Sequence, residues 1–159
     1  MTAPSQVLHV SFICTGNICR SPIAEKVFSH ELTAAGLTDR VLVTSAGIGN
    51  WHVGTSADRR ATALLRGRGY QDRHVARQVN SALLSADLLV AMDNDHRRAL
   101  QSMVPEPERV RLLRSFDPVA PPGADVPDPY YDAKGGFDDV LTMIEAAMPG
   151  LLDWVRERL

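Results

Sequence analysis

Cysteine is scarce in this sequence: its 159 residues include only Cys14 and Cys19. Two cysteines cannot form a disulfide framework, and a structural zinc site would need further cysteine or histidine partners at suitable spacing. We therefore expect no metal and a reducing compartment, of which the cytoplasm is the simplest. Export by a route that needs no signal peptide stays open.

Long apolar runs and strong net charge are also lacking. No run approaches the roughly 18 apolar residues of a membrane span, and residues 1–6 lack the basic and apolar regions of a signal peptide. The net charge is −2, which disfavours a nucleic-acid binder that relies on bulk positive charge. We expect neither a membrane nor a nucleic acid as a partner.

The composition that remains is that of an ordinary globular protein, with 45% hydrophobic and 23% charged residues. The length suits one domain with a sizeable core, and no internal repeat or linker divides it. We predict a single domain over residues 1–159. Arginines gather between Arg59 and Arg77. A solvated helix face is the favoured interpretation of this cluster, with a docking site as the alternative.

Strands and helices alternate along the predicted fold. Apolar, β-branched runs predict strands at residues 7–13, 41–45, 88–92 and 110–113. Helical spacing and end signals predict helices from Ser21 to a stop at Gly36, and over residues 56–68, 95–103 and 137–159. The order predicts an α/β fold of three layers, a four-stranded parallel sheet with helices on both faces. Ligands of such sheets bind beyond the carboxyl ends of the strands.

The first helix should begin with Ser21 as its N-cap and Pro22 in the first helical position. Apolar residues at helical spacing then predict its buried face: Ile23, Ala24, Val27, Phe28 and Leu32. The last helix contains Pro149 and Gly150, where a kink is possible.

The segment CTGNICRSP, residues 14–22, joins the first strand to this helix. Free N–H groups at a helix N-terminus can hold a phosphate, and Gly16 and Asn17 most easily adopt left-handed backbone angles. No Gly-Lys-Ser/Thr closes the segment, so it is not a nucleotide P-loop. The predicted phosphate-binding residues are Thr15, Gly16, Asn17, Ile18, Cys19 and Arg20.

Cys14 ends the strand beneath this expected oxyanion. The loop amides, the helix dipole and the Arg20 fork favour its thiolate form, a nucleophile in attacking position. The Ser21 hydroxyl could donate to that thiolate. The alternative is that Cys14 is only a core cysteine and Arg20 only a surface residue. This alternative does not explain why a strand, a Gly-Asn pair and a Ser-Pro helix start occur together here.

Residues 12–25, FICTGNICRSPIAE, resemble the active-site segment of the low-molecular-weight protein-tyrosine phosphatases. Three further segments look like that family in the right order: Thr44-Ser45-Ala46-Gly47, His74-Val75-Ala76-Arg77-Gln78 and Asp128-Pro129-Tyr130-Tyr131. The resemblance covers nearly the whole chain. It implies a cofactor-free enzyme that hydrolyses phosphotyrosine in proteins, and aryl phosphates, through a phosphocysteine intermediate.

A proton donor must face the thiolate, because phenolate is a poor leaving group in a dry cleft. Asp117 and Asp128 both precede proline in one loop, and the residues alone divide the choice evenly. The resemblance selects Asp128 as the general acid. The predicted catalytic residues are thus Cys14, Arg20 and Asp128.

The resemblance also implies supporting and recognition residues. Asn17, Ser21, Ser45 and His74 would support the loop. Tyr130 and Tyr131 would line the cleft and could be phosphorylated by a tyrosine kinase. From its position after the second strand, Trp51 stacks on the substrate ring or packs in the core.

Two rival functions stay open. Arsenate reductases share this fold and loop, but those that relay a disulfide need cysteines downstream of Cys19, and there are none. A non-catalytic phosphotyrosine-binding module would not need Cys14, Arg20 and Asp128 together. Cys19 is either a resolving thiol for oxidised Cys14 or a packing residue. Thr15 stands where the family commonly has an apolar residue.

Overall fold

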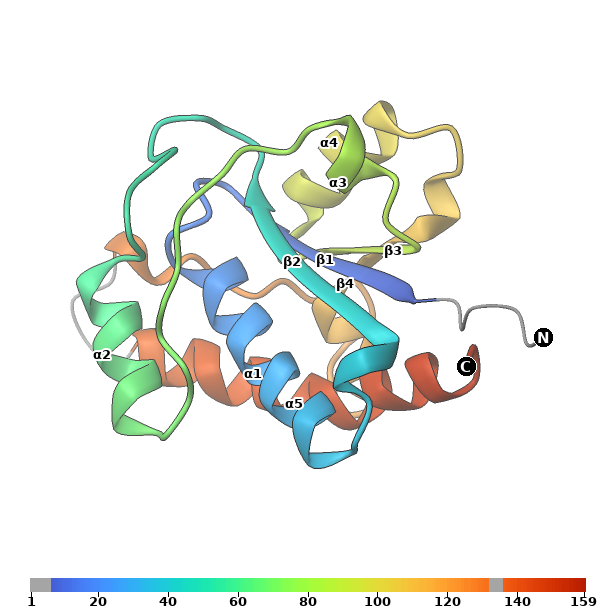
Figure 1. Ribbon diagram of the computed structural model, residues 1–159. Helices are drawn as coiled ribbons and strands as arrows, with labels where there is room; N and C mark the ends of the chain where they lie inside the picture. Colours follow the sequence, from blue (N-terminus) through green and yellow to red (C-terminus); the bar gives the residue numbers. More distant parts are fainter. Residues whose placement is uncertain (1–6, 132–135) are drawn as a thin grey trace.

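Four parallel strands form one sheet in the computed structural model, which describes residues 7–131 and 136–159 (Figure 1). The strands are β1 (Leu8–Cys14), β2 (Val41–Gly47), β3 (Leu88–Ala91) and β4 (Val110–Leu112). Their order across the sheet is β2-β1-β3-β4. β1 lies in the middle, in register from Leu8 opposite Val41 to Cys14 opposite Gly47.

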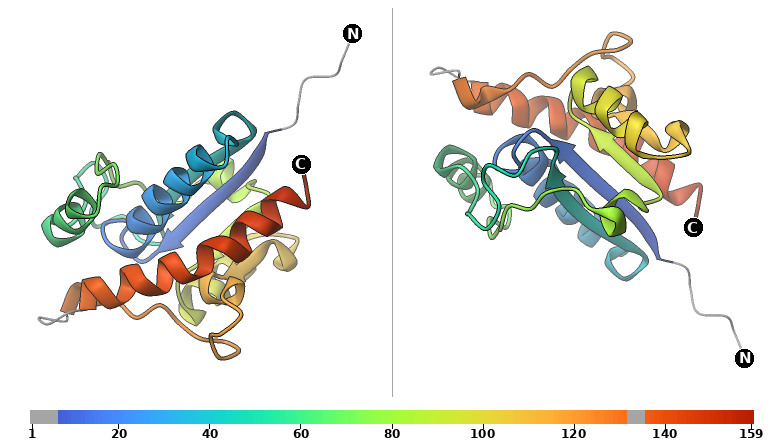
Figure 2. Two further views of the ribbon diagram at one scale, coloured as in Figure 1. Left: turned by 90° about the horizontal axis from the view of Figure 1, so that it is seen from below. Right: turned by 90° about the horizontal axis from the view of Figure 1, so that it is seen from above.

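Helices cover both faces of the sheet (Figure 2). One face carries α1 (Arg20–Ala34) and α5 (Gly136–Arg156), with α2 (Arg59–Gly67) beside α1; the other carries α3 (Ser81–Leu84) and α4 (Asn94–Met103). Short 3-10 turns lie at Thr38–Arg40, Pro107–Arg109, Leu113–Phe116 and Pro129–Tyr131. The predicted three-layer α/β fold is confirmed.

The side chains of β1 alternate between two hydrophobic cores. Val10 and Phe12 pack with α1 and α5, and Ile13 packs with α3 and α4. Phe12 meets Phe28 of α1 edge to face, with ring centroids 5.8 Å apart. The predicted α1 face is confirmed, since Ile23, Ala24, Val27, Phe28 and Leu32 are all buried.

The sheet reverses its winding between β1 and β3. The chain moves from β1 outward to β2 and then returns across β1 to β3 on its other side. This is the switch point at which open parallel sheets bind ligands. The loop after β1 and the start of α4 after β3 therefore meet at the carboxyl edge of the sheet.

The predicted start of α1 is wrong. The helix begins at Arg20 with Cys19 as its N-cap, and no side chain caps it. Ser21 lies inside the first turn because its hydroxyl has other partners, described below, and Pro22 follows it. Pro22 is still tolerated there, because first-turn N–H groups have no partner within the helix.

The other helices also differ at their ends. α2 begins at Arg59, because the Asp58 carboxylate accepts from the Arg60 N–H and caps the helix three residues later than predicted. α5 continues through Pro149 without interruption. At Gly150 the Phe116 carbonyl oxygen lies 2.1 Å from where a Cβ would be, so only glycine fits that contact. No helix in the described ranges combines the length and apolarity that crossing a bilayer requires.

Candidate active site

The loop 14–20, between β1 and α1, has most of its carbonyl groups occupied by hydrogen-bond donors. The Cys14, Thr15 and Ile18 carbonyls each accept from a backbone N–H at 2.9 Å, supplied by Ile48, Gly49 and Asp58 in turn. In contrast, no N–H of residues 15–19 donates a hydrogen bond within the described part of the chain. Occupied carbonyls and free amides at a helix N-terminus are the arrangement that holds an oxyanion.

Cys14 sits at the floor of this loop, with only 3% of its surface exposed. Its Sγ lies 2.9 Å from the Ser21 Oγ. The Asn17 Nδ2 donates to the same Oγ at 2.9 Å, which occupies a lone pair on that oxygen. The Ser21 hydrogen is therefore available to the sulfur, and Ser21 can stabilise a Cys14 thiolate.

Asn17 organises the buried side of the loop. Its φ of 58° is the only left-handed value at a non-glycine position in the described ranges. The Nδ2 also donates to the Ser45 Oγ at 3.0 Å, and Ser45 donates in turn to the Glu25 Oε1 at 2.6 Å. The hydrogen bonds of the Asn17 amide hold the backbone in a conformation that side chains otherwise disfavour.

The segment after α2 closes the network from behind. The His74 Nε2 donates to the Asn17 carbonyl oxygen at 2.7 Å, and the Arg77 N–H donates to the Asn17 Oδ1 at 3.0 Å. Burial lowers the pKa of His74, against the opposing effects of the Asn17 carbonyl and Glu25. A neutral ring with its proton on Nε2 satisfies this contact.

Gly47, at the end of β2, lets the loop approach the sheet closely. A Cβ at this position would lie 2.8 Å from the Thr15 carbonyl oxygen and 3.0 Å from the Asn17 nitrogen. These are backbone atoms, so a side chain at position 47 would have to displace the loop.

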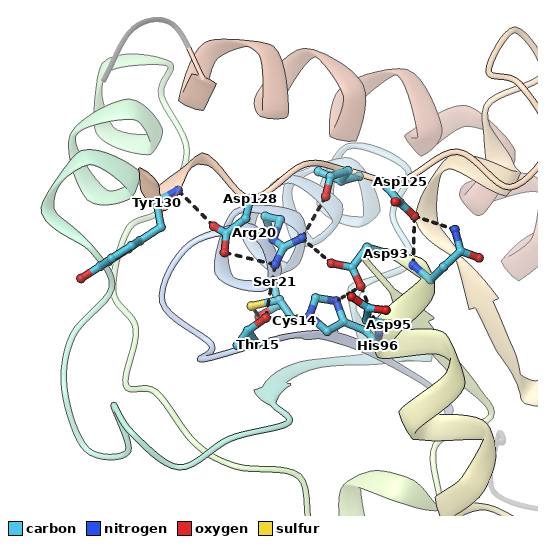
Figure 3. A network of polar contacts seen from close by, with 12 residues as sticks. Cys14, Thr15, Arg20, Ser21, Asp93, Asp95, His96, Asp125, Asp128 and Tyr130 are labelled. Atoms are coloured by element: carbon cyan, nitrogen blue, oxygen red, sulfur yellow. Dashed lines mark hydrogen bonds and ion pairs between the residues drawn. The ribbon is translucent and has the colours of Figure 1, made fainter. Parts of the chain in front are cut away.

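Arg20 reaches across the carboxyl edge of the sheet and is 3% exposed (Figure 3). Its Nη1 donates to the Asp93 Oδ2 and to the Val126 carbonyl oxygen, both at 2.9 Å. Its Nη2 lies 3.6 Å from the Asp128 Oδ2. One side of the guanidinium is therefore anchored while the other faces the site.

Asp93 has two roles: it holds Arg20 and caps α4 by accepting from the His96 N–H at 2.9 Å. Burial opposes ionisation of this carboxyl. The His96 N–H, the His96 ring and Arg20 outweigh burial, so the pKa of Asp93 lies below its ordinary value. Asp93 is therefore a fixed anion at the carboxyl end of β3.

His96 connects Asp93 to the loop. Its Nδ1 lies 3.2 Å from the Asp93 Oδ1, and its Nε2 lies 2.8 Å from the Thr15 Oγ1. Burial lowers the pKa of His96 to about 4, in spite of the Asp93 charge, so the ring is neutral near pH 7. The hydroxyl of Thr15 thus has a buried partner.

The two Asp-Pro sequences occupy different environments. Asp117 accepts from the Val119 N–H and forms a turn. Asp128 forms the same kind of turn with the Tyr130 N–H, but its other oxygen faces Arg20 over the loop. Its side chain is 37% exposed, so a substrate and water can reach it.

A cavity of about 430 Å³ opens over the sulfur. It is lined by Cys14, Thr15, Gly16, Ile18, Cys19, Arg20, Trp51, His52, Asp128 and Tyr130. Trp51 is 71% exposed and Tyr130 is 40% exposed, so Trp51 is not a core residue. The Trp51 ring packs over Gly49, where a Cβ would overlap it. The side chain of Tyr131 lies outside the described residues.

Cys19 shares this cavity with Cys14, and both are free thiols. Burial is the largest factor that raises the pKa of Cys19, and the Asp58 charge adds to it. Cys19 is thus a protonated thiol near neutral pH.

The structure brings together most of the predicted site residues. Cys14, Arg20 and Asp128 line one cavity, and Asn17, Ser21, Ser45 and His74 form one network behind it. The sequence analysis missed Asp93 and His96, the partners of Arg20 and Thr15, and it assigned no role to Glu25, Arg77 and His52. Asp93 could have been found, since it directly follows a predicted strand at the edge where ligands bind.

Known proteins resemble this chain over nearly its full length. Residues 9–159 match the family described as low molecular weight phosphotyrosine protein phosphatase. A relative from Mycobacterium tuberculosis, named low molecular weight protein-tyrosine phosphatase A, is 56% identical over 98% of this chain and 96% of its own. A Streptomyces coelicolor relative, named low molecular weight protein-tyrosine-phosphatase, is 50% identical over 95% of each chain.

A crystal structure of a protein tyrosine phosphatase from Entamoeba histolytica, with Hepes in its active site, superposes with a TM-score of 0.88. The two chains are 34% identical, and the match covers 94% of this chain and 97% of that one.

Proposed function

The chain belongs to the low molecular weight phosphotyrosine protein phosphatase family and is a protein-tyrosine phosphatase, and from that premise we propose how its residues carry out the reaction. One observation supports the proposal most directly: a single cavity has Cys14 at its floor and Arg20 and Asp128 above it. Residues 1–159 act as a single phosphatase domain that needs no cofactor.

The loop 14–20 binds the phosphoryl group. Its free amides and the Nη2 of Arg20 hydrogen-bond the three terminal oxygens, while Asp93 and Val126 keep the guanidinium in position. These donors stabilise the charge of the transition state, the role that metal ions have in many other phosphoryl transfers.

The first step forms a phosphocysteine. The Cys14 thiolate attacks phosphorus in line, so the S–P bond forms as the bond from phosphorus to the tyrosyl oxygen breaks. The electron pair leaves with that oxygen, and Asp128 protonates it. Tyrosine departs and Asp128 remains as a carboxylate.

The second step releases phosphate. Asp128 takes a proton from a water molecule, whose oxygen attacks phosphorus and breaks the S–P bond. The electron pair returns to Cys14, whose thiolate accepts a hydrogen bond from Ser21. Inorganic phosphate leaves, and Asp128 is again protonated for the next cycle.

Aromatic side chains at the cavity mouth select the substrate. Trp51 and Tyr130 both line the cavity over Cys14 and are both exposed. They stack on the ring of a phosphotyrosine side chain, and we assign Tyr131 the same role in recognition. Cys14 is 3% exposed, so a long aryl phosphate reaches it more easily than a short seryl phosphate.

The partners are phosphotyrosine proteins and a tyrosine kinase that modifies Tyr130 or Tyr131. Phosphorylation of Tyr130 would place a dianion beside Arg60, whose guanidinium lies 5.5 Å from the Tyr130 ring centroid. A cytoplasmic location fits the need to keep Cys14 reduced.

Steady-state kinetics with phosphotyrosine, phosphoserine and arsenate test the proposed reaction. We expect phosphate release from phosphotyrosine, far slower release from phosphoserine, and no arsenate-dependent thiol oxidation. Arsenate turnover would favour the reductase, and binding without any release would favour the phosphotyrosine-binding module. Cys14→Ser should abolish turnover and still bind phosphotyrosine, while full activity in this variant would contradict the mechanism.

Cys19 serves as the resolving thiol. After oxidation of Cys14 to a sulfenic acid, the Cys19 sulfur attacks it, a disulfide forms and water leaves. Because the pKa of Cys19 is raised, this step should be slow near neutral pH and faster in alkali. Cys19→Ser should recover activity less completely after peroxide and a reductant, and recovery equal to wild type would leave Cys19 a packing role only.

A further inference from the structure

A second, larger groove of about 990 Å³ shares no lining residue with the cavity over Cys14. Its walls come from α1, from α2 and from the segment 72–77. Figure 1 shows the chain after α2 running back between the α2 and α1 helices. The groove thus lies where the arginines between positions 59 and 77 gather, and we call it the arginine groove.

Positive charge dominates the arginine groove. Its charged lining residues are Glu25, Lys26, Arg59, Arg66, Asp72, Arg73 and Arg77. Both carboxylates are already neutralised, since Glu25 lies 2.7 Å from Lys26 and Asp72 lies 2.8 Å from Arg66. Within the described ranges, the other three arginines have no carboxylate partner within 4.0 Å. In a chain of net charge −2, this local excess attracts an anion.

The three arginines without a carboxylate partner come from two walls of the groove, and the Arg77 Nε donates to the Ser45 carbonyl oxygen at 3.1 Å. Arg59 begins α2, while Arg73 and Arg77 belong to the facing segment. Arg66 continues the α2 wall about 10 Å further along the helix axis, seven residues at about 1.5 Å each. One phosphate cannot reach both the walls and the ends of such a groove, whereas a chain of phosphoryl groups can. Guanidinium forks also suit phosphate oxygens.

We propose that the arginine groove binds a small oligophosphate, an anion with two or more linked phosphoryl groups. Apart from His74, whose ring bonds to the Asn17 carbonyl, the rest of the lining, including Ala57, Ala63, Thr62 and Val75, has small side chains, and no phenylalanine, tyrosine or tryptophan ring lines the groove to hold a base. The phosphate chain itself is therefore the part that is recognised. This binding goes beyond the phosphatase reaction and does not require it.

The groove is connected to the reacting sulfur by three hydrogen bonds. His74 lines the groove and donates to the Asn17 carbonyl; Asn17 donates to Ser21; and Ser21 contacts the Cys14 Sγ. An oligophosphate that orders the segment 72–77 will also order the loop 14–20. Occupancy should therefore change turnover without competing with substrate.

Calorimetric titration with inorganic tripolyphosphate tests the binding. Saturating phenylphosphonate is present throughout, so that the loop 14–20 is occupied. We expect one saturable site in wild type and a loss of affinity of about tenfold or more in Arg59→Ser/Arg73→Ser. Neither arginine side chain makes a hydrogen bond or an ion pair within the described ranges, so the variant should fold normally.

Arg98→Ser/Arg156→Ser is the matched control, because it removes the same charge from exposed helix positions outside both cavities. It should bind tripolyphosphate as wild type does. Equal losses in the two double variants, no saturable binding to wild type, or binding only without phenylphosphonate would overturn the proposal. Tighter binding of a poly-glutamate peptide at the same arginines would also overturn it, in favour of a protein partner.

Kinetics test the connection to Cys14. With wild type, tripolyphosphate should change kcat for p-nitrophenyl phosphate, and with Arg59→Ser/Arg73→Ser this change should disappear. Purely competitive inhibition, or an unchanged kcat at saturating tripolyphosphate, would overturn the coupling. The titration with phenylphosphonate does not depend on turnover, so a failure of the catalytic proposal would be recognised separately.

Discussion

The two sides of the loop 14–20 are built in opposite ways. On the front, the cavity side, Asp128 and Trp51 are exposed by 37% and 71%. On the rear, Asn17, Ser21 and Ser45 are completely buried and joined by hydrogen bonds. The front groups must change partners during a reaction, and the rear groups must not. Reactivity and rigidity are thus assigned to different faces of one short loop.

Substitutions should separate these two faces. A front variant should lose activity and keep its free energy of unfolding, because its side chain has few partners in the protein. A rear variant should lose both, because its hydrogen bonds shape the loop that the reaction uses.

Asp128→Asn should give the largest effect. The amide cannot protonate the leaving oxygen, so kcat should fall by about 10²- to 10⁴-fold, and more for phenyl phosphate than for p-nitrophenyl phosphate. The free energy of unfolding should stay within about 0.5 kcal/mol, because the amide oxygen can still accept from the Tyr130 N–H. Steady-state kinetics and urea unfolding measure the two quantities.

Asp117→Asn is the control for this prediction, since Asp117 forms the same turn away from the cavity. It should keep wild-type kinetics. An equal loss in both variants, or a loss in Asp128→Asn that ignores the leaving group, would contradict the assignment of the acid.

Asn17→Ala should reduce both quantities. The variant loses three side-chain hydrogen bonds, to Ser21, Ser45 and the Arg77 N–H, which together stabilise the fold by about 3 kcal/mol. Asn17→Gly loses the same bonds but tolerates the φ of 58°, so it should be about 1 kcal/mol more stable than Asn17→Ala. Urea unfolding and steady-state kinetics on the same variants measure the two quantities. An Asn17→Ala variant that is inactive but as stable as wild type would contradict the expectation that rear variants lose both.

His96 adds a pH-dependent effect at the border between the two faces. Its folded pKa, about 4, lies below the ordinary value of 6.5, so the unfolded chain binds more protons between these pH values. The contribution of His96 to the free energy of unfolding is therefore fully present above pH 6.5. It is lost as the pH drops towards 4, by up to about 3 kcal/mol.

His96→Gln removes this titration and keeps an amide that can bond to Thr15. Its free energy of unfolding should fall less between pH 7 and pH 4 than that of wild type. His9 and His74, whose pKa values are also lowered, leave a residual slope of the same sign. Parallel pH profiles for wild type and His96→Gln would contradict the prediction.

Trp51→Ala should have the smallest effect. The ring is 71% exposed at the cavity mouth, so its loss should raise KM for phosphotyrosine about three- to tenfold and leave kcat and stability nearly unchanged. Val53→Ala is the control, because Val53 is 53% exposed in the same segment and does not line the cavity. A similar KM change in both variants would leave Trp51 without a role in recognition.

The strand pattern and the loop chemistry were predictable because they are local. β-branched runs give the four strands, and the parallel order places the ends of β1 and β3 at one edge, where Cys14 and Arg20 were expected. The start of α1 was mispredicted because Ser21 fits an N-cap by its neighbours. Its actual partners are Cys14 and Asn17, and a capping rule does not contain them.

Asp93 and His96 were missed for a related reason. Asp93 lies 73 positions from Arg20, and His96 lies 81 positions from Thr15. The Asp-x-x-His spacing indicates only a helix start. A polar residue after a buried strand was a signal for Asp93, but nothing local predicts that a histidine on the first turn of α4 bonds to a loop threonine.

Gly47 has a consequence for how this enzyme can vary. A Cβ at position 47 would press on the backbone of Thr15 and Asn17. The width of the loop 14–20 around the anion therefore depends on the absence of a side chain there. Trp51 lies in the segment that follows, and its side chain can be exchanged without a change in the backbone of the loop 14–20. Substrate choice and the width of the loop 14–20 can therefore be changed separately. A directed change in the size of the bound anion would require a side chain at position 47.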